Sequence, residues 1–143
     1  MVRVEGGFEV AAKIKTKIDN YGVTSEVGWP PLGYPSAPFV EPAAKSSFMA
    51  DEGIICFGRL YYYNAALEPY GLPWSPLGDK PITITVRDSA GRAVGGTPTT
   101  VKTGSWFGEF SYHLGKLPPG KYSFVYEFPG DETYEGCRKR GRF

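Results

Sequence analysis

The chain has 143 residues, which is enough for one domain with a hydrophobic core and barely enough for two. Its 19 glycines and 13 prolines interrupt the sequence too often for long helices. The formal net charge of +1 gives no reason to expect a nucleic-acid partner, and no apolar run is long enough to span a membrane. We therefore expect an all-β protein built from short strands and many turns.

Residues 3 to 18 are predicted to hold the first strand, because apolar and polar positions alternate there. One face carries Lys13, Lys15 and Lys17, and the other includes Phe8 and Ile18. A lysine row is typical of a solvated strand face and protects an exposed sheet edge from unwanted pairing. The alternative is that this strand, with Phe8 and the lysines, pairs with a neighbouring subunit.

Residues 19 to 47 form a proline-rich segment in which neither a strand nor a helix is expected to persist. Aromatic residues are nevertheless interspersed in it, among them Trp29, Tyr34 and Phe39. A loop of this length in a small domain is uncommon and is often functional. We expect an extended arm that lies on a surface and docks these aromatic side chains.

Residues 48 to 63 are predicted to contain a central strand, because both of its faces are apolar. Residues 64 to 79 then form a second long loop, which carries Trp74. Trp29, Trp74 and Tyr62 are candidates for a platform on which a sugar stacks, or for the anchors of a protein interface. Burial of these rings inside their own domain is the third possibility.

The last third of the chain is predicted to form two strands joined by a turn. Residues 110 to 114 and residues 122 to 128 alternate between apolar or aromatic and polar side chains. Residues 118 to 120, Pro-Pro-Gly, indicate a tight reversal between them. The pair needs a second sheet to cover its aromatic face. Residues 138 to 143 follow as a short basic tail.

Seven short motifs follow one another from about residue 48 to residue 137. They are G-x-L, P-[IV]-x-[IV]-x-V, D-x-x-G, a threonine-rich strand, G-x-F, L-x-P-G-x-Y and F-P-G-D-x-x-Y, at residues 58–60, 81–86, 88–91, 97–103, 108–110, 117–122 and 128–134. In this order they resemble the immunoglobulin-like repeats of bacterial and archaeal surface proteins. The resemblance implies a seven-stranded antiparallel β-sandwich with a structural or adhesive role and no catalytic residues. Residues 1–47 have no counterpart in it, and the loop at 64–80 is longer than usual.

No sequence motif of a catalytic or phosphate-binding site occurs, and His113 is the only histidine. We therefore expect no enzyme and no cofactor. One group of acids suits a Ca²⁺ ion or is simply solvated, and its members are Asp51, Asp131, Glu132 and Glu135. The two cysteines, Cys56 and Cys137, either form a disulfide or remain as two buried thiols.

The expected organisation is a strand and arm at residues 1–47, an immunoglobulin-like sandwich at 48–137 and the basic tail at 138–143. We expect a non-enzymatic structural protein that assembles with itself by exchanging strands or arms, as a filament, surface-layer or virion subunit. The alternative is a monomeric module that binds a carbohydrate or a receptor through exposed aromatic residues. Either role points to the cell surface, the extracellular space or a virion, although residues 1–10 show no signal-peptide core.

Overall fold

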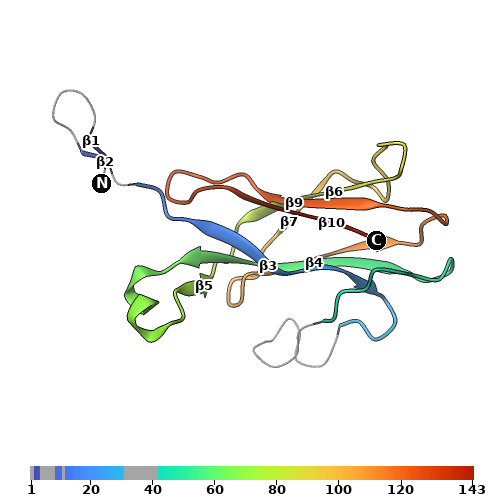
Figure 1. The fold of residues 1–143 in the computed structure, drawn as a ribbon, viewed down its shortest axis with the longest axis horizontal. Helices are drawn as coiled ribbons and strands as arrows, with labels where there is room; N and C mark the ends of the chain where they lie inside the picture. Colours follow the sequence, from blue (N-terminus) through green and yellow to red (C-terminus); the bar gives the residue numbers. More distant parts are fainter. Residues whose placement is uncertain (1, 4–8, 11, 31–41) are drawn as a thin grey trace.

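A computed structural model describes residues 2–3, 9–10, 12–30 and 42–143, and its main body is an antiparallel β-sandwich (Figure 1). One layer, the β9 sheet, has the order β10–β9–β6–β7 and consists of β6 (Pro81–Arg87), β7 (Thr99–Lys102), β9 (Ser123–Phe128) and β10 (Cys137–Arg142). The other layer, the β4 sheet, consists of β3 (Thr16–Ser25), β4 (Ile54–Tyr63), β5 (Trp74–Pro76) and β8 (Glu109–Gly115). The predicted all-β sandwich is confirmed.

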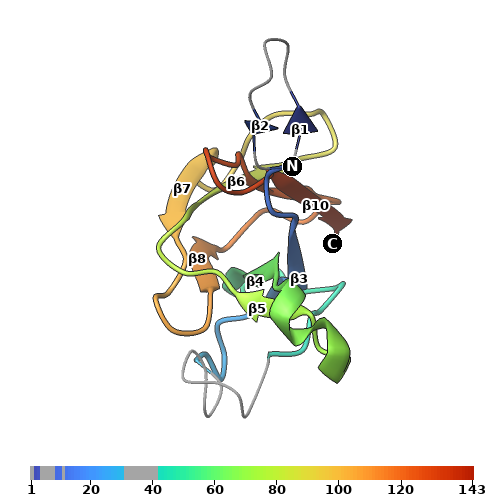
Figure 2. The same cartoon turned by 90° about the vertical axis from the view of Figure 1, so that its left-hand side faces the viewer.

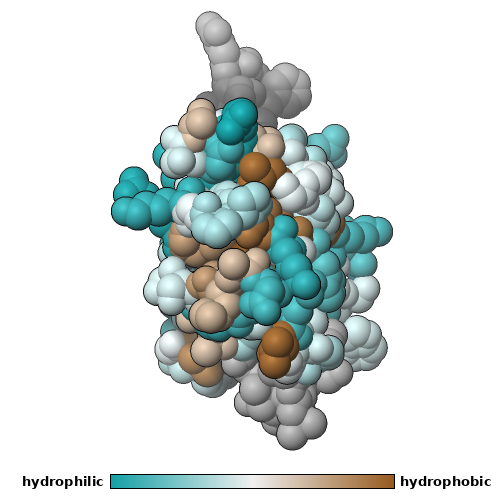
Figure 3. All heavy atoms as spheres, turned by 90° about the vertical axis from the view of Figure 1, so that its right-hand side faces the viewer, coloured by the Kyte–Doolittle hydropathy of each residue, from teal (hydrophilic) through white to brown (hydrophobic). Residues whose placement is uncertain are grey.

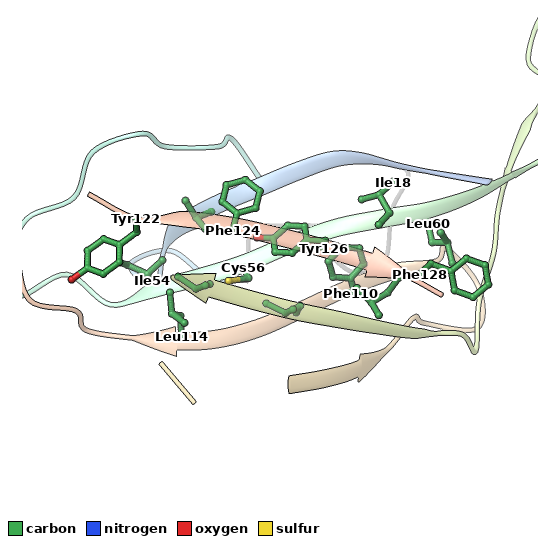
Figure 4. Packing of buried hydrophobic residues seen from close by; sticks show 14 of the residues in the cluster. Ile18, Ile54, Cys56, Leu60, Phe110, Leu114, Tyr122, Phe124, Tyr126 and Phe128 are labelled. Atoms are coloured by element: carbon green, nitrogen blue, oxygen red, sulfur yellow. The ribbon is translucent and has the colours of Figure 1, made fainter. Parts of the chain in front are cut away.

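The core lies between the two sheets and is built from the inward positions of alternating strands (Figure 4). In the β9 sheet, the ring of Tyr126 is stacked on Phe124 with centroids 4.8 Å apart. Phe110 of the opposite sheet meets the same Tyr126 ring edge to face at 5.3 Å. Gly58 sits beneath Phe110, and a Cβ atom there would lie 2.6 Å from the ring. The glycine of the G-x-L motif therefore makes room for an aromatic ring from the next strand.

The two strands of the last third do not pair with each other, which corrects the prediction of a hairpin. Strand β8 pairs with β4, whereas β9 pairs with β6 and β10 in the other layer. Residues 116–122 carry the chain from one sheet to the other. The apolar faces of β8 and β9 thus cover each other across the core. Because the two strands lie in opposite sheets, the apolar face of each is buried against the other. In a hairpin within one sheet, both apolar faces would point to the same side and would need another layer to cover them.

The first long strand begins later than the sequence predicts. Strands β1 (Val2–Arg3) and β2 (Glu9–Val10) pair with each other, and β3 then runs from Thr16 to Ser25. Strand β3 crosses a region that was expected to break any strand. It does so with an irregularity between Asp19 and Gly22, where Asn20 adopts a φ of 49°. A β-bulge absorbs the unfavourable residues and bends the strand without ending it.

Strand β3 belongs to the sandwich, so the sandwich does not start at residue 48. Ile18 and Val23 are buried in the core, and β3 pairs with β4 over eight registered positions from Thr16 to Ser25. The predicted basic tail is likewise a strand, because β10 pairs with β9 from Cys137 to Arg142. Its alternation of half-buried and exposed residues is that of an edge strand with one face on the core.

The described ends of the proline-rich segment lie on the domain itself. The backbone N–H of Glu26 donates to the carbonyl of Gly53, and that of Lys45 donates to Val23. The Trp29 ring lies 6.2 Å from Phe57, on the outer face of the β4 sheet. Trp29 and its neighbours thus cover the outer face of β4. This explains why the outward residues in the first part of β4 are as buried as the inward ones.

The second long loop contains a short 3-10 helix, η1 (Ala65–Tyr70), followed by β5 (Figure 2). The side chain of Asn64 accepts from the N–H of Ala66 at its start, and Gly71 ends it with a φ of 77°. Asn at the start and Gly at the end are typical helix-capping residues, so the sequence already contained the signals for this short helix. No helix in the described part of the chain is long and apolar enough to cross a membrane.

Candidate functional site

An aromatic and cationic cluster lies on the outer face of the β4 sheet, at the end where β4 leads into η1. The Lys17 ammonium lies 4.7 Å from the centroid of Trp74 and 5.8 Å from that of Tyr61. Tyr63 meets Trp74 edge to face at 5.5 Å, and its hydroxyl donates to the Glu68 carboxylate. All four of these cation and ring positions are half-buried. Lys17 is thus held over the Trp74 and Tyr61 rings by cation–π attraction, and it covers part of their surface.

The three aromatic residues that the sequence analysis grouped as one platform are separated in the structure. Tyr62 lies on the inner face of β4, where it meets Tyr134 edge to face at 5.7 Å. Trp74 lies on the outer face, and Trp29 lies against Phe57. Successive residues of a strand point to opposite faces, so Tyr62 cannot share a surface with its neighbours. The same rule, applied to the sequence, would have selected Tyr61 and Tyr63 instead.

The predicted lysine row is also divided. Lys17 covers the aromatic cluster and forms an ion pair of 3.2 Å with Asp19. Lys13 and Lys15 are exposed on the segment that precedes β3. That segment pairs in parallel with the chain before β10, since the N–H of Ile14 donates to the carbonyl of Thr133. Phe8, Tyr34 and Phe39 lie outside the described residues.

The candidate Ca²⁺ ligands do not come together. Asp51 lies just before β4, and Asp131 follows β9 at the opposite end of the sandwich (Figure 1). Asp131 instead receives the Lys80 ammonium at 2.7 Å and two backbone N–H groups. The Lys80 hydrogen bond is the main cause that lowers the pKa of Asp131 to about 2. In the described ranges, no three acidic, histidine or cysteine side chains are placed to share a metal ion.

The two cysteines are separate thiols, which is the second of the two alternatives left open by the sequence. Cys56 points into the core from β4, and burial raises the pKa of its thiol to about 12. Cys137 opens β10 and is half-buried, and burial again raises its pKa. Cys56 lies near the start of β4, whereas Cys137 pairs with Phe128 at the end of β9, so the two thiols lie at different positions along the sandwich.

A buried arginine on the outer face of the β4 sheet was missed by the sequence analysis. Arg59 is 6% exposed, and its register neighbours are Asp19 on β3 and Glu109 on β8. Its guanidinium carbon lies 5.8 Å from the ring centroid of Phe107. In-register residues on adjacent strands lie on the same face of a sheet. The carboxylate-bearing residues Asp19 and Glu109 therefore lie on either side of the buried Arg59. The sequence did contain a signal for this site, because Arg59 is the one charged residue in the otherwise uncharged strand β4.

Strand β7 and the β1–β2 pair lie at the margins of the described fold, as β10 does at the other edge of the β9 sheet. Strand β7 pairs with β6 and forms an edge of the β9 sheet. Strands β1 and β2 form a small pairing of their own that stands away from the sandwich (Figures 1 and 2). Unpaired N–H and C=O groups on an edge strand are templates for a strand from another molecule. The exposed His113 of β8 lies 3.4 Å from the Glu26 carboxylate.

Comparison of the chain with protein-family models, with curated proteins and with solved structures found no match.

Proposed function

We propose that this protein is a non-enzymatic structural subunit that assembles with copies of itself. The observation that carries the proposal is the β1–β2 pair, which stands apart from a sandwich that itself ends in an edge strand, β7. A strand added to β7 satisfies that edge through main-chain hydrogen bonds, which need little side-chain specificity. A filament, a surface layer and a virion shell are the assemblies in which such a subunit serves.

The decisive experiment removes residues 1–11 and leaves the sandwich complete. A larger deletion through residue 47 is unsuitable, because it removes β3 and with it the core residues Ile18 and Val23. We expect the shortened protein to fold and to associate less than the full chain in sedimentation velocity runs at rising concentration. Unchanged association would refute a role for the β1–β2 pair.

A matched control replaces the exposed Lys13 and Lys15 with alanine and keeps the β1–β2 backbone. Because strand addition depends on main-chain groups, this variant is expected to associate like the unmodified chain. Loss of association in the control would assign the contact to the two ammonium groups instead.

Carbohydrate binding is the second candidate function, and the cluster of Lys17, Tyr61, Tyr63 and Trp74 favours it. Aromatic rings beside a polar group offer a sugar an apolar face and a hydrogen-bond partner. Trp74→Ala is then expected to abolish binding on a glycan array, with Trp106→Ala as the control at an exposed ring outside the cluster. An array without any signal from the unmodified protein would count against this function.

A further inference from the structure

An apolar hollow of about 480 Å³ opens at the end of the sandwich where β4 begins. Figure 3 faces this end, and apolar atoms gather near its centre between polar flanks. The residues that form its apolar wall are Phe48, Met49, Ile54, Leu117, Tyr122 and Phe143. The wall is firm, because Phe143 stacks on Tyr122 at 5.5 Å and meets Phe48 edge to face at 5.8 Å.

The charged side chains that line this hollow are both cations, Lys121 and Arg142. Lys121 is exposed, and Arg142 stands on the outward side of β10. No Asp or Glu side chain is among the described residues that line it. An occupant that combines an apolar side chain with a negative charge therefore fits the hollow better than a neutral or basic one.

The opposite end of the molecule carries such a group. Residues 68–72, which we call the tip, close the loop that contains η1 (Figure 2). Tyr70 is 78% exposed and Leu72 is 73% exposed, two of the five large apolar side chains that stand out most among the described residues. Glu68 is the charged residue of the tip, and η1 carries no basic residue in its last turn.

The tip is held in one shape before any partner arrives. The carbonyl of Glu68 accepts from the N–H of Gly71, and the hydroxyl of Tyr63 donates to the Glu68 carboxylate. Prolines at positions 69 and 73 restrict the backbone on either side. A group that is already ordered loses little conformational entropy when it docks.

One strand links the hollow to the tip. Ile54 at the start of β4 lines the hollow, and Tyr63 at its end contacts Glu68 of the tip. Ten residues of strand span about 33 Å, so the two features lie at opposite ends of the molecule (Figure 1). When a surface at one end of a subunit binds a different surface at the other end of the next copy, the same contact can repeat from copy to copy. Such a head-to-tail contact produces an open filament unless the rotation between successive copies closes a ring.

We propose that the tip of one copy inserts Tyr70 and Leu72 into the hollow of the next copy, with Glu68 facing Lys121 and Arg142. The inference rests on the proposed self-assembly and names a contact that strand addition does not provide. Two side chains bury less surface than the roughly 1,200–2,000 Å² of stable interfaces. The contact is therefore weak alone and orders copies end to end within a larger assembly, at a repeat of no less than about 33 Å.

The test uses three variants of the full chain. The tip variant carries Tyr70→Ser and Leu72→Ser, and the hollow variant carries Ser47→Trp, which places a ring in the opening. The matched control is Trp106→Ser, which removes an 84% exposed ring that belongs to neither surface. All changed side chains are exposed in the monomer, so circular dichroism and thermal unfolding are expected to match the unmodified protein.

Sedimentation equilibrium and electron microscopy supply the readout. We expect the tip and hollow variants each to lower the end-to-end association constant about a hundredfold, since two apolar side chains stay in water. The control is expected to associate like the unmodified chain. An equimolar mixture of the tip and hollow variants is expected to form pairs, because each pair still contains one intact tip and one intact hollow.

The outcomes separate this inference from the proposed function. A protein that assembles equally well with and without Tyr70 and Leu72 refutes the tip contact and leaves self-assembly standing. A full chain that stays monomeric at millimolar concentration refutes both. Lys121→Glu is expected to weaken association and Glu68→Lys in the same chain to restore it, and failure of that restoration refutes the charge pairing.

Discussion

The hydroxyl group of Tyr126 offers a direct test of how the two sheets are held together. It lies in β9, is fully buried and donates a hydrogen bond to the carbonyl of Gly22 in β3, across the sandwich. Tyr126→Phe keeps the ring and its contacts with Phe110 and Phe124 but leaves the Gly22 carbonyl without this donor. The expected result is a folded protein that is less stable.

The magnitude follows from the burial of the acceptor. A buried carbonyl that loses its partner costs about 1–3 kcal/mol, whereas a hydrogen bond that water can replace contributes about 0.5–1.5 kcal/mol. With about 2.1 cal/mol/K of unfolding entropy per residue over 143 residues, a loss of 1–3 kcal/mol lowers Tm by roughly 3–10 °C. The measurement is thermal unfolding followed by circular dichroism, at a concentration where the protein is monomeric.

The matched control is Tyr112→Phe. Its hydroxyl donates to the carbonyl of Gly95 at 2.7 Å, in a loop that is only partly buried. We expect the control to lower Tm by less than Tyr126→Phe does. An equal or larger loss in the control, or an unchanged Tm for Tyr126→Phe, would refute the view that this bond joins the sheets.

Two further predictions concern titratable groups. The pKa of Asp131 falls from its ordinary 3.8 to about 2 in the folded protein, so its contribution to stability is complete above about pH 4 and is lost as the pH falls toward 2. Asp131→Asn should therefore lower Tm at pH 7 by an amount that shrinks between pH 5 and pH 2, and a constant difference would contradict the assignment. Iodoacetamide is expected to modify Cys56 only after unfolding and Cys137 slowly in the native state, because burial raises the pKa of both thiols. Equal native and denatured labelling rates, or an intact mass lacking two hydrogens, would contradict the free thiols.

The sequence by itself determined the strands with a clear alternation and, within them, which way the side chains point. It did not predict the continuation of β3 beyond residue 18 or the strand β10. The alternation of residues 82–86 and 122–128 is confirmed by the burial of every inward position. The D-x-x-G motif at residues 88–91 forms a turn, since Asp88 accepts from the N–H groups of Ala90 and Arg92. Such signals are local, because they depend on neighbours within a few residues.

Only the tertiary structure decided which strands are partners. Strands β8 and β9 are adjacent in sequence yet lie in opposite sheets, because each supplies the apolar cover that the other needs. The placement of Trp74 was decided in the same way, since the pairing of β5 with β4 brings it beside Lys17 on the outer face. Tyr62 faces the core because of the local alternation of β4. Pairing across the core depends on residues far apart in the chain, as the bond from Tyr126 to Gly22 shows, and periodicity in the sequence carries no record of it.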